Sequence, residues 1–427
     1  MRRAVAIVDG EHYPPVVRQA LEELDDLVVA AVLVGGAEKL RGGEDYGVPL
    51  EPTLESAVLE HAPEVVIDLS DEPVLSPPDR LALASRALAL GVPYEGPDFR
   101  FEPPVFVPVD LPTLAVIGTG KRVGKTAVTG HVARRLALSS HVVVVAMGRG
   151  GPPEPEVVTV PPTVDSLLAL SRAGRHAASD HLETALVAGT PTVGCRRCGG
   201  GLAGAVGISN VLEGVALAGA LEPGLVVLDG SGAALPPVAA GRRLLVSSAA
   251  QPIEVAAGYL NAYRALISDL VLVTMAEQSA PHGALADALR AHTRPGTPVI
   301  RTVLRPRPLE PVAGERVAFF CTAPSSSHPT LAAHLAERHG ARVAHVSGAL
   351  ADRARLGDEL ARVDADVFVV ELKAAAVDVV VEEAARREIK VVIAANDVVP
   401  LGGEPDLDAE LARLAAEAQA LAVERVS

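Results

Sequence analysis

Short runs of β-branched residues alternate with longer Ala- and Leu-rich stretches along the chain. The short runs have the length and composition of buried strands, and the longer stretches repeat apolar residues with the period of a helix. Near the N-terminus the pattern predicts strands at 4–8, 27–34 and 65–69, and helices at 15–24, 53–61 and 79–90. Strands that alternate with helices are typical of a mainly parallel α/β sheet.

The same alternation continues to the end of the chain. It predicts further strands at 113–117, 141–147, 225–228, 243–246, 270–274 and 299–304, and then at 316–320, 342–346, 367–370 and 391–394. An Ala-rich stretch at 407–423 predicts a terminal amphipathic helix. The whole chain is therefore expected to be α/β.

Two proline-rich stretches, 97–112 and 305–314, interrupt this pattern. Proline cannot continue a helix or donate to a sheet ladder, so both stretches are interpreted as linkers. The expected division is an N-terminal α/β domain at 1–105, a central domain at 106–310 and a C-terminal α/β domain at 311–427.

Composition excludes several function classes. The chain has 427 residues, with 38 Lys and Arg against 53 Asp and Glu, a formal charge of −15. Nucleic-acid binding needs a basic face or aromatic stacking platforms, but aromatics are 3% here and Trp is absent. The chain has no apolar run of ~18 residues, and only five apolar residues follow the basic pair after Met1. We therefore expect no nucleic-acid partner, no membrane partner and a cytoplasmic location.

Cysteine and lysine are both scarce. Cys195 and Cys198 form a lone CxxC and Cys321 stands apart, so ordinary reduced thiols are preferred to a zinc site, and their role is left open. Only five of the 38 cationic residues are lysines: Lys39, Lys121, Lys125, Lys373 and Lys390. Where Arg supplies nearly all positive charge, a Lys can mark a place that needs a compact ammonium.

A glycine-rich turn after the predicted strand at 113–117 carries the chemistry. The stretch 118–126 reads GTGKRVGKT and leads into a helical run. Strand, glycine turn and helix together form a phosphate-binding loop, in which backbone N–H groups and the helix N-terminus hold phosphates. The first glycine is one residue early for the usual pattern, and the loop instead resembles that of dethiobiotin synthetase. The expected nucleotide-binding residues are Gly118, Thr119, Gly120, Arg122, Val123, Gly124, Lys125 and Thr126.

A second motif follows at 225–232, where an apolar strand ends in Asp229. Such an Asp, with the Thr126 hydroxyl, is expected to hold Mg²⁺, while Lys125 reaches the β- and γ-phosphates. No guanine-recognition Asn-Lys-x-Asp follows, so ATP is the expected nucleotide.

Arginines indicate a second anionic ligand. Arg149 follows a predicted strand in a glycine-rich segment, and Arg196 and Arg197 lie in a second one at 194–201. Because neighbouring arginines repel, a site that holds them is expected to hold an anion, with Lys121 as a further cation. Asp180, His181 and Glu183 precede the second segment and are interpreted as a polar helix face.

Polar residues also follow strands in the two outer segments. Asp9 and Glu11 come after the first predicted strand, and Glu371 and Lys373 end a strand near the C-terminus. Carboxyl ends of parallel strands are where α/β crevices form. Whether these residues contribute to the site stays open.

The order of these motifs resembles the cyclic 2,3-diphosphoglycerate synthetase family. The resemblance rests on segments spread from residue 7 to about 380: IVDGEHYPP, GTGKRVGKTAVTGHVA, VVAMGRGGPPEPE, ASDHLETALVAGTPTVGCRRCGGGLAG, VVLDGSG and VVELKAAAVDVV. The phosphate-binding loop is shared by many ATPases, whereas the arginine-containing segments are much more specific to this family.

The resemblance implies an ATP-dependent ligase that closes 2,3-bisphosphoglycerate into its cyclic phosphoanhydride and releases ADP and phosphate. It implies a three-layer P-loop NTPase core flanked by two smaller Rossmann-like domains, and it suggests a homodimer. Lys125, Lys121, Arg149, Arg196 and Arg197 are then the expected catalytic cations. Two alternatives remain open: a dethiobiotin-synthetase-like carboxylate ligase or small-molecule kinase, and a nucleotide-gated chaperone or switch.

Overall fold

The computed structural model describes residues 1–42, 45–277 and 281–426. The N-terminal part is a six-stranded sheet of order β3-β2-β1-β4-β5-β6, parallel except for its last hairpin. Its elements are β1 (Arg3–Val8), α1 (Pro14–Glu23), β2 (Leu27–Leu33), η1 (Ala37–Lys39), β3 (Leu50–Glu51), α2 (Leu54–His61), β4 (Val65–Asp68), α3 (Pro77–Ala89), β5 (Tyr94–Gly96) and β6 (Phe99–Phe101). The strands and helices expected here are confirmed.

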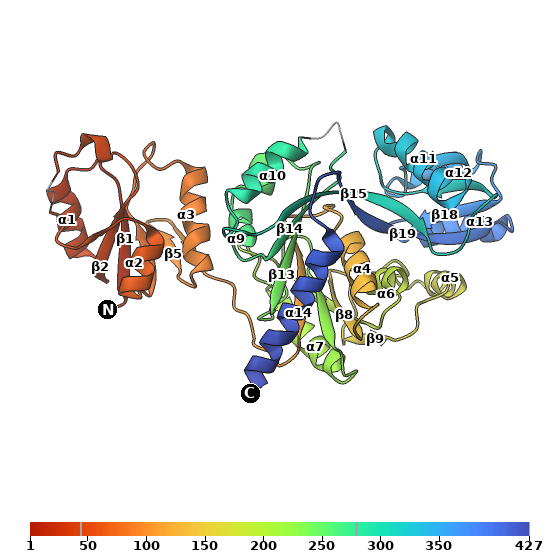
Figure 1. The fold of residues 1–427 in the computed structure, drawn as a ribbon, viewed down its shortest axis with the longest axis horizontal. Coiled ribbons are helices and arrows are strands. Elements are labelled where there is room, and N and C mark those ends of the chain that lie inside the picture. Colours follow the sequence, from red (N-terminus) through yellow and green to blue (C-terminus); the bar gives the residue numbers. More distant parts are fainter. Residues whose placement is uncertain (43–44, 278–280, 427) are drawn as a thin grey trace.

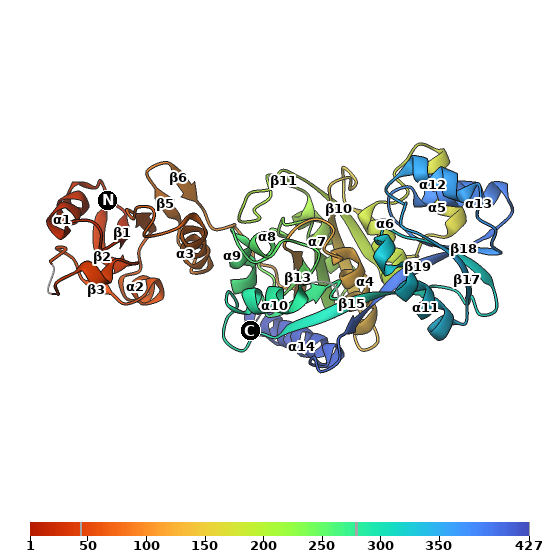
Figure 2. The same ribbon diagram turned by 90° about the horizontal axis from the view of Figure 1, so that it is seen from above.

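A stretch of mostly irregular chain joins this lobe to the rest of the molecule (Figure 2). It contains the first proline-rich segment, which is a connector except for the short strand β6. The lobe contacts the centre through α3, which packs against α9 (Asn261–Leu266). Ser85 Oγ of α3 donates to Tyr259 O at 3.5 Å.

All the other strands form one large sheet, ordered β11-β10-β8-β12-β7-β13-β14-β15-β19-β18-β16-β17, with β9 paired to β10. Its central strands, all parallel, are β7 (Thr113–Gly118), β8 (Val142–Gly148), β10 (Thr192–Cys198), β12 (Leu225–Asp229), β13 (Arg242–Ser248) and β14 (Leu270–Thr274). Two short strands, β9 (Glu156–Val158) and β11 (Ile208–Ser209), pair antiparallel to β10. The carboxyl ends of β7, β8, β10 and β12 therefore share one edge.

Helices cover both faces of the central sheet and make it three-layered (Figure 1). Leu114 and Val116 of β7 pack on one face with α4 (Lys125–Leu136) and α14 (Leu407–Val426), and α6 (Asp180–Ala188) lies beside α4. Ala115 and Ile117 face the other layer. That layer contains α7 (Val211–Gly219), α8 (Ile253–Ala256), α9 and α10 (His282–Arg290). The expected terminal helix is present, and it contacts the central layer although the predicted third segment ran through residue 427.

The second proline-rich stretch is not a linker where the sequence placed it. β15 (Val299–Pro308) runs through it and pairs antiparallel with β19 (Lys390–Pro400) from Thr302 to Pro308. Leu309 N donates to Ile393 O of β19. Because backbone N–H groups alternate in direction along a strand, the nitrogens of Pro306 and Pro308 point away from β19. On that other side, the pairing of β15 with β14 has already ended at Arg301. Proline is tolerated at such unpaired edge positions. The strand therefore joins the central and C-terminal sheets.

The C-terminal part continues this sheet with β16 (Arg316–Phe320), β17 (Arg342–Ser347) and β18 (Val367–Glu371). Its helices are η2 (Ser325–Ser327), α11 (His328–His339), α12 (Arg353–Leu360), η3 (Ala376–Val381), a π-helix, and α13 (Glu382–Arg386). One of its cores also contains Leu167 and Leu168 of α5 (Val164–Arg172) and Leu182 of α6. The central and C-terminal parts therefore share apolar contacts beside the edge formed by β8 and β10.

Candidate active site at the phosphate-binding loop

The predicted phosphate-binding loop lies between β7 and α4. Gly124 precedes the helix at φ 81° and Arg122 has φ 60°, so the loop uses left-handed backbone at two positions. Its residues are tied to neighbouring strand ends. Thr274 Oγ1 donates to Val123 O at 2.7 Å, and Asn261 Nδ2 donates to Thr119 O at 3.1 Å. These hydrogen bonds hold the loop in place before any nucleotide arrives.

Lys125 and Asp229 form a buried ion pair at the centre of the loop. Lys125 Nζ lies 2.5 Å from Asp229 Oδ1, and their side chains are only 10% and 2% exposed. Thr129 Oγ1 donates to the same oxygen at 2.9 Å. Burial raises the pKa of Asp229, and the Lys125 ammonium opposes that rise. The end of β12 thus lies beside the lysine of the loop.

Oxygen ligands suited to a magnesium ion are present at this point. Both hydrogen bonds to Asp229 use Oδ1, and no described residue bonds to Oδ2. Thr126 follows Lys125 in the first turn of α4 and offers a hydroxyl. Carboxylate and hydroxyl oxygens beside phosphates are the usual protein ligands of Mg²⁺. The residues present therefore fit that ion.

The side chains of three cationic residues lie around Gly232, three residues after Asp229. Gly232 has φ 59°, and a Cβ there would lie 2.9 Å from Arg149 Nη2, 3.8 Å from Arg197 Nη2 and 3.8 Å from Lys121 Cγ. Arg197 donates to Ser231 O at 2.8 Å and to Gly199 O at 2.9 Å, while its buried Nε has no partner among the described residues. Burial lowers the pKa of Arg197, and the neighbouring Arg149 guanidinium lowers it further. No described carboxylate forms an ion pair with any of these three side chains, although Asp180 interacts electrostatically with Arg197.

Arg196 does not join this cluster. The segment predicted as a glycine-rich loop is strand β10 up to Cys198, so alternate side chains point to opposite faces. Gly194, on the Arg196 face, lies against the His181 ring of α6, where a Cβ would be 2.6 Å from Cγ. Cys195, on the Arg197 face, lies against α7. The expectation that the two adjacent arginines act together is therefore wrong for their side chains.

The same alternation separates the two cysteines of the CxxC. Cys195 is buried against Gly214 of α7, and burial raises its pKa to about 12, whereas Cys198 is exposed. The third thiol, Cys321, is buried, and burial likewise raises its pKa to about 12. Residues three apart in a strand face opposite sides, so Cys195 and Cys198 do not present a common metal site.

The interpretation of Asp180, His181 and Glu183 as a polar helix face is wrong for two of them. His181 is 7% exposed and Glu183 is 8% exposed. Burial raises the pKa of Glu183 to about 8, with Asp180, Glu371 and Asp229 adding to the rise and Lys373 opposing it. Sequence reasoning missed this because the burial comes from long-range packing: His181 lies against Gly194 of β10, and α6 as a whole packs against α4, β8 and β10.

The N-terminal and C-terminal parts differ in whether their predicted residues lie near the central site. Glu371 and Lys373, at the end of β18, interact electrostatically with Glu183 and so lie next to the central site. Asp9 instead accepts hydrogen bonds within its own lobe, from the backbone of Glu11, His12 and Asp71, and Glu11 pairs with Lys39. No interaction described for Asp9 or Glu11 reaches the phosphate-binding loop.

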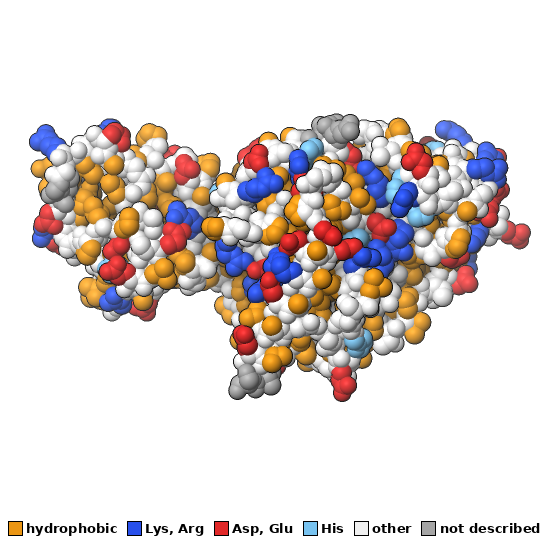
Figure 3. Space-filling view, in the orientation of Figure 1, with side chains coloured by type: hydrophobic (Ala, Val, Ile, Leu, Met, Phe, Trp, Pro, Cys, Tyr) orange, Lys and Arg blue, Asp and Glu red, His pale blue; other side chains and the backbone are white. Residues whose placement is uncertain are grey.

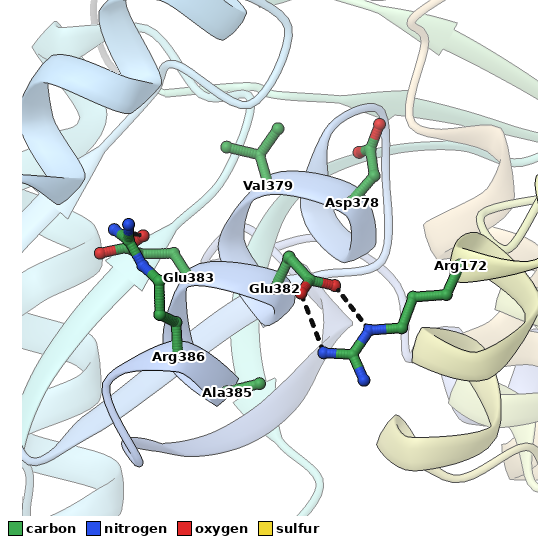
Figure 4. Close-up of a pocket in the computed structure, with 7 residues that line it drawn as sticks. All are labelled: Arg172, Asp378, Val379, Glu382, Glu383, Ala385 and Arg386. Atoms are coloured by element: carbon green, nitrogen blue, oxygen red, sulfur yellow. Dashed lines mark hydrogen bonds and ion pairs between the residues drawn. The ribbon is translucent and has the colours of Figure 1, made fainter.

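A separate cavity of about 520 Å³ lies between α5 and the η3–α13 segment (Figure 4). Arg172 of α5 and Glu382 of α13 form a double hydrogen bond across it, at 3.0 and 2.9 Å. The pair fastens the C-terminal part to α5 and contains none of the predicted site residues.

The surface carries both signs of charge. Lys and Arg lie beside Asp and Glu over the central and C-terminal parts and do not form one continuous basic face in the view shown (Figure 3). Within the described ranges, no helix is both long enough and apolar enough to cross a membrane.

Family models match three successive parts of the chain. Their descriptions are cyclic 2,3-diphosphoglycerate synthetase N-terminal domain at residues 3–102, P-loop domain at 113–294 and C-terminal domain at 308–397. The P-loop match covers the ion pair and the three cations, and the C-terminal match covers Glu371 and Lys373.

Several proteins named cyclic 2,3-diphosphoglycerate synthetase are similar over nearly their whole length. The one from Rubrobacter xylanophilus is 49% identical over 432 residues, 97% of each chain. That from Pyrococcus abyssi is 42% identical and covers 94% of this chain and 95% of its own. That from Methanothermobacter thermautotrophicus is 39% identical, with 95% and 94% covered. With an ATP-binding P-loop core between two further α/β parts, this chain belongs to the cyclic 2,3-diphosphoglycerate synthetase family, a family of ligase-type enzymes.

Proposed function

We propose that the protein is an ATP-dependent ligase that cyclises 2,3-bisphosphoglycerate by forming an intramolecular phosphoanhydride, with release of ADP and phosphate. The observation that carries the substrate is the cluster of Arg149, Arg197 and Lys121 around Gly232, next to the Lys125–Asp229 pair. A bisphosphate bound beside ATP brings two polyanions together. Unit charges ~4 Å apart repel by about 1 kcal/mol in water and about 4 kcal/mol near a protein surface, so such a site needs concentrated cations.

The proposed reaction has two steps. An oxygen of one substrate phosphate attacks the γ-phosphorus of ATP, and the bond from that phosphorus to the β-phosphate oxygen breaks to release ADP. The first substrate phosphate now carries the γ-phosphoryl group as a pyrophosphoryl group. An oxygen of the other substrate phosphate then attacks the substrate phosphorus of that group, the bond from this phosphorus to the bridging oxygen breaks, and orthophosphate leaves as the ring closes. Phosphates are ionised near neutral pH, so positioning and charge stabilisation supply the catalysis.

Each site residue has a role in this proposal. Backbone groups from Gly118 to Gly124 cradle the ATP phosphates, and Lys125 leaves Asp229 to contact the β- and γ-phosphates. Arg149, Arg197 and Lys121 bind the substrate phosphates, whereas Arg196 is assigned a lesser part because its side chain faces α6. Thr126 and Asp229 would hold Mg²⁺, which supplies charge neutralisation when bound.

We also propose a cytoplasmic location and a homodimeric form. A reducing cytoplasm suits a protein whose Cys195, Cys198 and Cys321 are all free thiols. A homodimer is proposed only from the family resemblance, and sedimentation of the full chain would test it.

Phosphate release tests the substrate. The protein with ATP and Mg²⁺ is offered 2,3-bisphosphoglycerate, 2-phosphoglycerate or diaminopelargonate, and released phosphate is measured. We expect stimulation by the bisphosphate and a cyclic product without free phosphomonoester groups. Release stimulated only by diaminopelargonate would favour a carboxylate ligase, and substrate-independent release would favour a nucleotide switch.

Isotope transfer tests the order of bonds. Substrate labelled with ¹⁸O in its non-ester phosphate oxygens is turned over in ordinary water. In the proposed reaction, the bridging oxygen of the pyrophosphoryl intermediate comes from the substrate and leaves with the γ-phosphoryl group. Each released phosphate therefore carries one labelled substrate oxygen. Unlabelled phosphate would rule out the pyrophosphoryl intermediate.

A further inference from the structure

The turn that follows β18 holds a lysine between the C-terminal and central parts. Lys373 N donates to Glu371 O at 2.8 Å, and Ala374 follows with φ 45°, a left-handed conformation that is strained for a residue with a side chain. The π-helix η3 begins two residues later, at Ala376. Strained backbone and π-helical turns persist only where the surrounding structure enforces them, and they are frequent at functional sites.

A buried hydrogen bond supports this turn. Glu371 is 8% exposed, and its Oε1 accepts a hydrogen bond from Asn396 Nδ2 of β19 at 2.7 Å. Its other oxygen, Oε2, lies 3.6 Å from Lys373 Nζ, which is longer than a usual charge-assisted hydrogen bond. The carboxylate is therefore fixed by Asn396, and the ammonium is held near it without a close contact.

The ammonium also lies near α6, a helix that packs against α4 of the phosphate-binding loop. Glu183 of α6 interacts electrostatically with Lys373 and with Asp229, the partner of the loop lysine. The neighbouring residue Leu182 packs in the C-terminal core, which keeps α6 against the domain that carries Lys373. Lys373 therefore lies on the α6 side of the site, where Glu183 interacts electrostatically with both Lys373 and Asp229.

Two other lysines give a useful contrast. Lys39 and Lys390 pair with Glu11 and Glu310, and their side chains are 54% and 52% exposed. The Lys373 side chain is 29% exposed. Burial alone would lower the pKa of Lys373, but the carboxylates of Glu371 and Glu183 outweigh it and raise that pKa, so the group stays charged.

We propose that Lys373 is a substrate-binding residue, which contacts one phosphate of the bisphosphate on the side of the site opposite the Arg149 and Arg197 cluster. This proposal rests on the proposed function. The long Lys373–Glu371 separation leaves ammonium hydrogens free for a phosphate oxygen, and a dianionic phosphate attracts an ammonium more strongly than one carboxylate does. The C-terminal domain then completes the substrate site.

Kinetics of paired variants test the proposal. Lys373→Met is compared with Lys390→Met, which removes a surface lysine of the same domain. We expect Lys373→Met to lower kcat/KM for the bisphosphate at least tenfold, with the dissociation constant of ATP changed less than twofold. Lys390→Met should leave both within twofold, and Lys373→Arg should recover part of the loss. An unchanged kcat/KM in Lys373→Met, or an equal loss of ATP affinity, would overturn the assignment.

A measurement on the unmodified protein covers the case in which Lys373→Met does not fold. The protein is treated with an amine-acylating reagent with and without the bisphosphate, and acylation of each lysine is measured by peptide mass spectrometry. We expect the bisphosphate to slow acylation of Lys373 at least threefold and to leave Lys390 unaffected. Equal rates at Lys373 in a protein that does turn over the bisphosphate would refute the inference and leave the proposed function standing. Absence of turnover with the bisphosphate would instead refute the proposed function.

Discussion

The buried pair of Lys125 and Asp229 predicts that one substitution lowers the stability of the fold and that a second one restores this stability without restoring turnover. Replacing Lys125 with Met removes the cation 2.5 Å from a carboxylate that is 2% exposed. Among the residues that the structure describes, the hydroxyl of Thr129 is then the one remaining hydrogen-bond donor to the Asp229 side chain. Leaving one partner of a buried pair charged and unpaired costs about 3 kcal/mol or more. For a domain of this size that loss lowers the melting temperature by roughly 6 °C.

The loss depends on pH because Asp229 can take up a proton. Its folded-state pKa is already raised by burial, and it rises further once the lysine is gone. A carboxyl whose pKa is higher in the folded state destabilises that state increasingly as pH rises above the unfolded value of about 3.9. The destabilisation by Lys125→Met, relative to the wild type, should therefore be largest at pH 8 and less than half as large at pH 5.

The melting temperatures of the wild type and Lys125→Met, measured at pH 5 and pH 8 in EDTA without nucleotide, test this pH dependence. Asp229→Asn is added to Lys125→Met as a control that removes the unpaired carboxylate. We expect the double variant Lys125→Met/Asp229→Asn to unfold within 2 °C of the wild type at pH 8, because no buried charge remains unpaired, yet to have no turnover. If the single variant loses the same stability at pH 5 and pH 8, or if Asp229→Asn restores none of it, the reasoning about the buried carboxylate is wrong.

Three further predictions follow from packing and exposure. A Cβ on Gly214 would lie 2.1 Å from Cys195 Sγ, so Gly214→Ala should lower the free energy of unfolding by about 2 kcal/mol, and adding Cys195→Ala should restore at least half, as measured by urea denaturation. Arg197→Met should raise KM for the bisphosphate at least tenfold, and Arg196→Met less than threefold; equal effects would show that both side chains reach the substrate. Iodoacetamide at pH 8 should alkylate Cys198 rapidly and Cys195 slowly, because Cys198 is exposed and burial raises the pKa of the Cys195 thiol to about 12; comparable rates would contradict that burial.

Much of the fold could be predicted because local rules decide it. The strand and glycine turn around Gly118 and the buried strand ending in Asp229 are specified by nearby residues, and the structure places Lys125 beside Asp229. The pairing of β15 with β19 could not be predicted, because the two strands are far apart in sequence and prolines within a strand indicate a break. Pro306 and Pro308 are acceptable only because their nitrogens face away from β19.

The site was predicted less completely for a related reason. Arg196 and Arg197 are adjacent in sequence, but a strand sends them to opposite faces, which a loop interpretation does not reveal. Glu183 is linked to the site only through electrostatic interactions with Asp229 and Lys373, which come from separate parts of the chain. Long-range proximity of this kind leaves no local signal in a single sequence.

The position of the last helix has a consequence for how the protein is made. α14 packs on β7 and α4, although most of the central part and the strands of the C-terminal domain lie between them in the sequence, and its Leu411 and Leu414 are fully buried in their core. During synthesis, the apolar surface of β7 and α4 that α14 covers in the folded protein stays exposed until residues 407–426 have left the ribosome. The C-terminal domain, by contrast, has its own strands and cores complete by residue 400. A ribosome that stalls or terminates between those two points would release a chain with a finished C-terminal domain and an unfinished nucleotide-binding layer.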